Sequence, residues 1–203
     1  AGNPAAAMAI GGLLDYLHET QKTDLSHIAN FTYYTSGQYM DLDLAARRNL
    51  ELTQTMRQGE RRGSLLWVMD QTKTAMGSRM LRSWMDKPLM HPHQINRRLD
   101  AVETLVKDSV TRQELAEFLR KVCDLERVMT RVITGTCSAK DLRQLSNGIE
   151  PLPQIKALLQ DYRTGILQTY HNQLDDLSDL KDAIDRTIVD ETPFTIREGG
   201  IIR

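Results

Sequence analysis

Apolar side chains recur every three or four residues along most of the chain, and this spacing predicts a mostly α-helical protein. One clean stripe is formed by Ile95, Leu99, Val102 and Val106. No repeat of about 30 to 50 residues emerges, which argues against a regular solenoid. Helices are therefore expected over residues 5–18, 65–71, 74–88, 95–106, 111–132, 138–149, 155–166 and 174–188.

The segment of residues 72–88 carries the most complete set of helix signals. Thr74 is a suitable N-cap, Gly77 leaves room for another element to approach closely, and Pro88 stops the helix. We expect Trp84 to be buried as the anchor of this helix. The apolar stripe that it shares is formed by Leu81, Trp84 and Met85.

Short polar sequences predict where several other helices begin. Ser64 is a good N-cap for the apolar run after it, and Pro92 suits a first helical turn. Residues 111–114, Thr-Arg-Gln-Glu, form a capping-box pattern, and Ser138 opens a further helix. Asp124 interrupts one apolar stripe, so a break or kink is expected there.

Three short segments alternate in polarity as β-strands do. Residues 31–40 predict a small hairpin around Ser36-Gly37, and residues 40–52 predict a strand that runs into a helix. Residues 194–203 are β-like, and a strand so short has nothing to pair with, so we interpret it as cut. The predicted fold is mostly α: a long-helix core domain with a small N-terminal β-hairpin and a truncated β segment at the C-terminus.

The composition is that of an ordinary globular protein. Of 203 residues, 40% are hydrophobic and 26% are charged, which is enough for one substantial domain. The net charge of −1 argues against a dedicated nucleic-acid-binding domain, which should be basic. No apolar run reaches the roughly 20 residues of a membrane span, so no membrane partner is expected. Cys123 and Cys137 are too few for a disulfide framework, so we interpret them as small core residues and expect a cytoplasmic protein.

Several basic and imidazole clusters suggest a chemical role, and each has a simpler structural interpretation. His91 and His93 flank a proline, but no third ligand stands at metal-binding spacing, so a loop that enters a helix is favoured over zinc. The other histidines are scattered, at His18, His27 and His171. A polar loop between glycines, in which solvation is more common than phosphate contact, contains Arg57, Arg61 and Arg62.

The acidic residues near the last stripe are also expected to stay solvated, on an open helix face that points away from DNA. Carboxylates perform acid–base chemistry only where burial or crowding shifts their pKa. The sequence has no G-x-x-x-x-G-K-[ST] loop and no supported Ser-His-Asp or Cys-His group. We therefore expect no enzymatic activity and no catalytic, cofactor-binding or metal-binding residue in this chain. The acidic residues are Asp175, Asp176, Asp179, Asp182 and Asp185.

Two longer patterns resemble the MutS family of DNA mismatch repair proteins. The first is D-x-x-(T/A)-R-R-N-L-E-(L/I), and the second is T-x-x-G-x-R-(L/M)-L-(R/K)-x-W-x-x-x-P. Residues 11–21, 124–132 and 194–203 are also similar to MutS segments, so the resemblance covers nearly the whole chain. The matching residues are Asp43, Ala46, Arg47, Arg48, Asn49, Leu50, Glu51 and Leu52, then Thr74, Gly77, Arg79, Met80, Leu81, Arg82, Trp84 and Pro88.

The resemblance implies a division of roles along the chain. Residues 1–20 would lead from the connector domain, residues 21–193 would form an incomplete helical core or lever domain, and residues 194–203 would begin the clamp domain. In the family, this core couples the ATPase domain to closure of the clamp on DNA. The parent protein would be a DNA-dependent ATPase that uses ATP and Mg and recognises mispaired bases in double-stranded DNA. Its expected partners are a second MutS copy and a MutL-type protein.

The resemblance leaves the DNA contacts of this chain unassigned. The Phe-x-Glu element with which MutS proteins wedge at a mismatch does not occur, because Phe31, Phe118 and Phe194 each lack a Glu two residues later. Arg47 and Arg48 lie inside the first pattern, where an ion pair or carbonyl contact that locks the strand-to-helix junction is favoured over phosphate contact. Two alternatives stay open: a helical protein–protein interaction module, and the MutS branch that is not devoted to mismatch repair.

Overall fold

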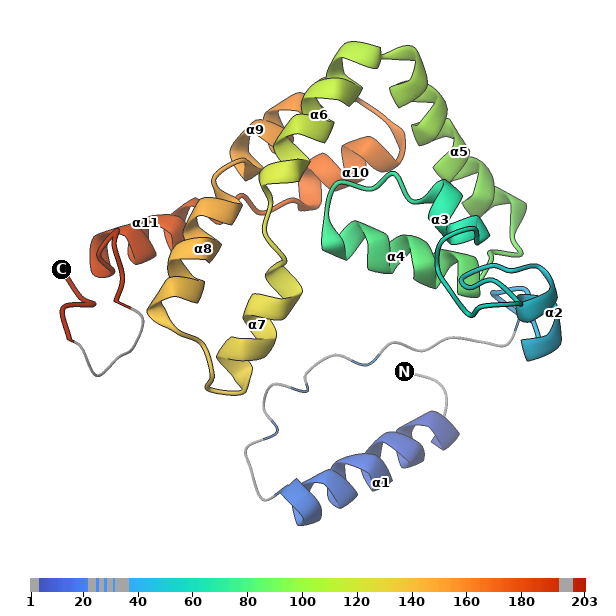
Figure 1. The fold of residues 1–203 in the computed structure, drawn as a ribbon, viewed down its shortest axis with the longest axis horizontal. Coiled ribbons are helices and arrows are strands. Elements are labelled where there is room, and N and C mark those ends of the chain that lie inside the picture. Colours follow the sequence, from blue (N-terminus) through green and yellow to red (C-terminus); the bar gives the residue numbers. More distant parts are fainter. Residues whose placement is uncertain (1–3, 22–24, 26–27, 29–30, 32–36, 194–198) are drawn as a thin grey trace. The chain divides into compact units, whose positions relative to one another are not determined.

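The computed structural model describes residues 4–21, 25, 28, 31, 37–193 and 199–203, and it divides into the units Ala1–Gln38 and Tyr39–Arg203 (Figure 1). The first unit contains helix α1, Pro4–Gln21, as the spacing of its apolar residues predicts. None of its residues is buried, and Met8, Leu13 and Tyr16 are more than half exposed. Within the described residues of this unit, α1 is the one helix, and its apolar residues stay partly or largely exposed.

The second unit is helical along most of its described length, which confirms the predicted helical class. Four of the predicted starts hold: Ser64, Thr74 and Ser138 accept hydrogen bonds as N-caps, and α5 begins at Pro92. Its helices are α2 (Leu44–Asn49), α3 (Leu65–Met69), α4 (Ala75–Asp86), α5 (Pro92–Lys107), α6 (Ser109–Lys121), α7 (Leu125–Ile133), α8 (Ala139–Ile149), α9 (Leu152–Leu159), α10 (Gly165–Gln173) and α11 (Ser178–Thr187).

Helices α5 to α11 pack in two groups around one apolar core, and α3 lies against α4. In the first group, α5 lies against α6 and α10, and α9 lies against the same two helices. In the second group, α8 lies against α7 and α11. Both groups are visible in Figure 1. The core residues come from both groups, so they form one continuous interior: Leu115, Val128, Leu145, Ile149, Leu152, Ile155, Leu159, Leu167, Ile184 and Ile188.

A glycine permits the closest approach in this core. A Cβ atom placed on Gly148 of α8 would lie 2.3 Å from Sγ of Cys123 and 2.9 Å from its backbone nitrogen. Cys123 belongs to the short break between α6 and α7, which the sequence predicts at Asp124. The absence of a side chain at Gly148 therefore lets α8 cross this break at a distance that no other residue allows.

Charged residues join α8 to α11 and to the segment after it. Nη1 of Arg143 donates to Oδ1 of Asp185 at 2.7 Å, and Oγ of the buried Ser146 donates to the same oxygen at 2.6 Å. Nζ of Lys181 donates to Oδ2 of Asp185 at 2.7 Å. These hydrogen bonds, the one from Lys181 first, lower the pKa of Asp185 to about 2. Arg143 also pairs with Asp190.

This arrangement corrects the expectation that five acidic residues line one open helix face. Asp185 is engaged by α8, because the long side chain of Arg143 reaches it from a residue 42 positions away. Asp175 and Asp176 precede the helix, where they accept backbone hydrogen bonds from Leu177 and Ser178. Such local bonds favour a turn, so α11 begins at Ser178 and not at residue 174.

Of the strand and following helix predicted over residues 40–52, the strand is wrong, whereas the helix is present as α2. In the described residues, β pairing is limited to isolated bridges between Tyr39 and Leu89 and between Ile188 and Ile202. Asp43 caps α2 directly after the first bridge, which leaves too few residues for a strand. The predicted hairpin over residues 31–40 and the cut strand over residues 194–203 fall partly on residues 32–36 and 194–198, outside the described residues, and both stay predictions. The expectation that the last segment has nothing to pair with is wrong, because Ile202 forms a bridge with Ile188.

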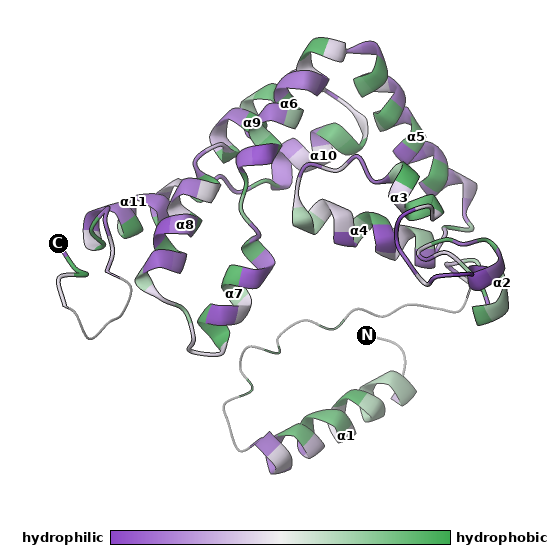
Figure 2. Ribbon diagram, in the orientation of Figure 1, coloured by the Kyte–Doolittle hydropathy of each residue, from purple (hydrophilic) through white to green (hydrophobic). Residues whose placement is uncertain are grey.

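One packing expectation, for the apolar stripe of α5, is also wrong. Leu99, Val102 and Val106 are more than half exposed, because α5 turns a different face, with Ala101 and Leu105, towards the core. In Figure 2, apolar and polar residues alternate along this helix.

The predicted capping box over residues 111–114 is replaced by an earlier cap. The helix already starts at Ser109, and Oδ1 of Asp108 accepts a hydrogen bond from the Thr111 nitrogen. This bond is the first cause of the lowered pKa of Asp108.

Among the described residues, the structure contains no helix of the length and apolarity that a bilayer crossing requires.

Candidate functional site

The first sequence pattern forms a junction between α2 and α4. Asp43 accepts a hydrogen bond from the Ala46 nitrogen at 2.6 Å and so caps α2. Arg47 donates from Nε to the Leu42 carbonyl at 2.9 Å and from Nη2 to the Asp86 carbonyl at 3.1 Å. It also lies 3.5 Å from the Asp86 carboxylate. The predicted locking role is therefore confirmed for Arg47, although the elements it joins are two helices.

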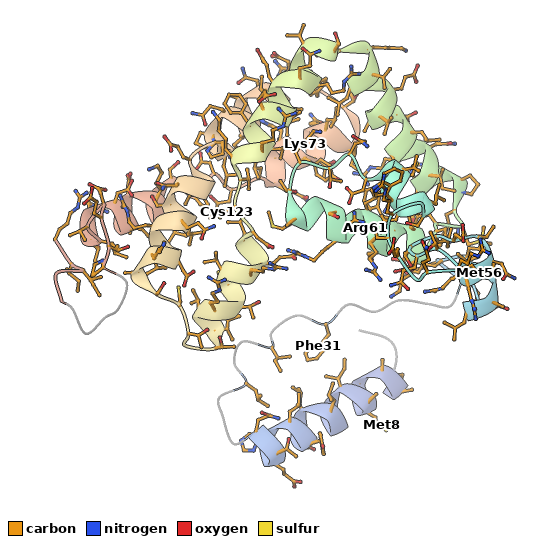
Figure 3. All side chains as sticks on the ribbon, viewed as in Figure 1. Met8, Phe31, Met56, Arg61, Lys73 and Cys123 are labelled. Carbon is orange, nitrogen blue, oxygen red and sulfur yellow. The ribbon has the colours of Figure 1, made fainter. Side chains whose placement is uncertain are left out.

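The loop between α2 and α3 folds back on its own start. Oε1 of Glu51 accepts a hydrogen bond from the Met56 nitrogen at 2.6 Å. The backbone nitrogen of Leu66 donates to the Leu52 carbonyl at 2.8 Å, and both leucines are buried. Met56 and Arg61, both on this loop, are labelled in Figure 3. The loop is thus held at both ends by the apolar residues of the first pattern and of α3.

Asp70 is the polar centre that joins this loop to α4. Its carboxylate accepts hydrogen bonds from Oγ of Ser78 at 2.5 Å and from Oγ1 of Thr72 at 2.6 Å, and it pairs with Arg61. Only 8% of its side chain is exposed. The bond from Ser78, followed by that from Thr72, lowers the pKa of Asp70 to about 2. Arg61 is therefore a partner of Asp70, and sequence patterns alone did not indicate this pairing.

The second pattern specifies how α4 begins and packs. Oγ1 of Thr74 accepts a hydrogen bond from the Gly77 nitrogen at 3.0 Å. A Cβ atom on Gly77 would lie only 2.9 Å from that oxygen, so glycine suits the capped turn. Trp84 is 38% exposed, which corrects the expectation that it is a buried anchor. The Arg98 guanidinium of α5 lies 3.6 Å from the centre of its ring and covers one face of it.

Arg79 connects α4 to the start of α7. Its guanidinium donates to both oxygens of Asp124, at 2.9 and 2.6 Å, and to Glu126 at 2.8 and 2.5 Å. Asp124 also caps α7 by accepting from the Arg127 nitrogen at 3.4 Å. The bond from Arg79 lowers the pKa of Asp124. The partners stand 45 residues apart, and the one sequence signal for the link is that Arg79 belongs to the second pattern.

The residues weighed as metal or redox candidates adopt structural positions. His91 precedes α5 in the N-cap position, as expected for a loop that enters a helix. Among the described residues, no group of three or more metal-ligating side chains gathers. Cys123 and Cys137 are free thiols, and burial raises the pKa of both. The described histidine and cysteine side chains therefore give no sign of metal or redox chemistry, and the contacts of the two sequence patterns are of the kind that holds helices in place.

Comparison with known proteins shows which family this chain resembles. The family described as MutS domain III matches residues 45–203. A protein named DNA mismatch repair protein MutS from Acetivibrio thermocellus is 49% identical over 195 residues, which are 96% of this chain and 22% of that protein. Proteins of the same name from Symbiobacterium thermophilum and Staphylococcus aureus are 46% and 44% identical, over 98% and 94% of this chain.

The extent of these matches defines what the chain corresponds to. It spans only 23% and 22% of the Symbiobacterium and Staphylococcus proteins, so it matches about a fifth of their length. The family match includes α2 almost from its start, all of α3 to α11, and both sequence patterns apart from the start of the first. The chain therefore belongs to the MutS family of DNA mismatch repair proteins, and residues 45–203 correspond to the region described as MutS domain III.

Proposed function

We propose that this chain is the helical core of a MutS-type protein and couples the nucleotide state of an ATPase domain to clamp closure on DNA. In this proposal residues 21–193 form the core, residues 1–20 lead from the connector domain, and residues 194–203 begin the clamp. The family match to domain III and the names of the relatives support this proposal.

The observation that carries the coupling role is a continuous path of direct contacts. Arg79 links α4 to Asp124 at the start of α7, α7 packs on α8, and α8 packs on α11. Because Gly148 has no side chain, α8 packs directly against Cys123 in the segment between α6 and α7. Close-packed helices with few voids move together, so a displacement of α4 is passed to α11.

The parent protein is proposed to supply the chemistry that this chain does not. We infer a DNA-dependent ATPase that uses ATP and Mg, acts on mispaired double-stranded DNA, forms a homodimer and engages a MutL-type partner. In this proposal the chain contributes a stiff set of helices that links the ATPase domain to the clamp while ATP is turned over. Titration of the isolated chain with ATP and magnesium should accordingly give no saturable heat, and micromolar binding would contradict this assignment.

The coupling role can be tested in a chimera. The matched region of the Acetivibrio thermocellus protein is replaced by this chain, and turnover of ATP is measured with and without a mismatched duplex. Arg79→Gln should reduce stimulation by the duplex at least fivefold and change basal turnover less than twofold. The matched control is Arg163→Gln, an exposed arginine outside the path. Unchanged stimulation in the Arg79 variant would refute the path.

The two alternatives receive different support. The three relatives named above are all called DNA mismatch repair proteins, which favours the repair branch over the branch not devoted to repair. An interaction module is favoured by one observation, the exposed Leu99, Val102 and Val106 on α5. That face is compatible with a helical core that also contacts other protein segments.

A further inference from the structure

A pocket lined by arginines lies between α2, the loop after it and the second half of α4. Its volume is about 570 Å³, and it includes residues 53–56 and Gly59 of the loop. Arg47 and Arg48 reach it from α2, and Arg82 reaches it from α4. Asp86 is the one acidic residue among those that line it. The pocket therefore gathers three guanidinium groups around one carboxylate.

The three arginines are not equivalent. Arg47 is committed to the junction, because it bonds two backbone carbonyls and lies 3.5 Å from the Asp86 carboxylate. Arg48 and Arg82 are exposed, and neither forms an ion pair with a carboxylate in the part of the chain that the structure describes. Two cations thus border the pocket after its only acid has been neutralised.

The charge around the pocket is opposite to that of the whole chain. Residues 44–63 contain five arginines and two glutamates, a net charge of +3, whereas the complete chain carries −1. Arg61 is paired with Asp70, and Glu51 accepts a backbone hydrogen bond. Of the five arginines only Arg47 and Arg48 line the pocket; with Arg82 and Asp86 of α4 the lining residues carry three positive charges and one negative charge, so the excess at the cavity is positive.

We propose that this pocket binds a phosphate group. Guanidinium groups match phosphate oxygens in geometry and charge, and Thr53, Gln54 and Thr55 line the same pocket with neutral hydrogen-bonding groups. Two guanidiniums together with these groups offer more donors than the two oxygens of one carboxylate accept, which favours phosphate over an acidic side chain. The chemistry fits a phosphodiester of duplex DNA and a free phosphate compound alike. The inference is independent of the coupling role.

The first experiment measures binding of the chain to a fluorescein-labelled matched duplex by anisotropy, from 25 to 200 mM KCl. Arg48→Gln with Arg82→Gln should make the slope of log K against log salt shallower by about 2, as the loss of two phosphate contacts requires. Affinity at the lowest salt should fall at least tenfold. The control pair Arg163→Gln with Arg186→Gln removes the same charge from exposed positions elsewhere.

The second experiment identifies the source of the phosphate. Pyrophosphate is titrated calorimetrically at constant ionic strength into the chain and into both variant pairs, with circular dichroism melting to show that each is folded. DNA binding that depends on Arg48 and Arg82 identifies the nucleic acid backbone as the source. Pyrophosphate binding that depends on them, without a matching effect on DNA, identifies a free phosphate compound. The proposal falls if both pairs lose binding equally, if neither ligand depends on the pocket, or if a polyglutamate peptide binds it more tightly than pyrophosphate.

Discussion

Replacement of Asp70 by Asn tests whether its carboxylate holds the loop after α2 against α4. The pKa of Asp70 falls from its ordinary value of 3.8 to about 2, first through the bond from Ser78 and then through that from Thr72. Each pKa unit corresponds to about 1.4 kcal/mol, so the ionised form favours the folded state by about 2 kcal/mol. Asn keeps one acceptor oxygen and loses the charge, so Asp70→Asn should lower the free energy of unfolding by about 2 kcal/mol at pH 7.

The pH dependence gives this prediction a direction. Because the pKa of Asp70 is lowered by folding, its contribution is fully present above the unfolded pKa and is lost as the pH falls through the folded pKa. The difference between the wild type and Asp70→Asn should therefore be constant from pH 7 to about pH 5 and shrink between about pH 4 and pH 2.

Urea unfolding followed by circular dichroism measures the effect, and Asp182→Asn on the exposed face of α11 is the control. The control should change the free energy of unfolding by less than about 0.5 kcal/mol. A difference for Asp70→Asn below that value at pH 7, or one that persists unchanged at pH 2, would show that the carboxylate does not organise this segment.

Three other predictions concern the packing and the link to α7. Gly148→Ala should destabilise the chain by about 1–3 kcal/mol in urea unfolding. Adding Cys123→Ala should recover only part of this loss, because the Cβ atom of residue 123, at 2.4 Å, and its backbone nitrogen, at 2.9 Å, stay too close. Trp84→Ala should lower the free energy of unfolding by about 2 kcal/mol, less than a fully buried ring, and a change near zero would mean that its packing is dispensable. Arg79→Gln should raise the pKa of Asp124 towards its ordinary value, as NMR titration of its carboxyl carbon can show, and an unmoved pKa would contradict the bidentate contact.

Sequence reasoning succeeds here where the signal is local. Ser64, Thr74 and Ser138 cap helices by bonding nitrogens three residues later, so the residue type and its position suffice. The competition between Asp108 and Thr111 shows the limit of this method. Both are acceptable caps, and the earlier one wins in a setting where Oδ2 of Asp108 also accepts a hydrogen bond at 3.0 Å from the Tyr162 hydroxyl, 54 residues away.

Contacts between distant residues are what the sequence could not supply. The spacing of Leu99 and Val102 predicts an apolar face, but periodicity does not say which element covers it, and both side chains are exposed. The candidate site has the same limit. Arg79 and Arg47 stand out through the motifs, yet their partners Asp124 and Asp86 are fixed only by the folded chain.

The pairing around Ile188 and Ile202 determines how much additional sequence the chain can accept between these two residues. The Val189 nitrogen donates to the Ile201 carbonyl and the Arg203 nitrogen to the Thr187 carbonyl, each at 3.0 Å, so the two ends of the intervening stretch are fastened side by side. Once the ends are fixed, each doubling of the stretch costs only about 0.6 kcal/mol in closure entropy. This position should therefore accept inserted sequence, from a short epitope to a whole folded module, while α8 and α11 keep their packing.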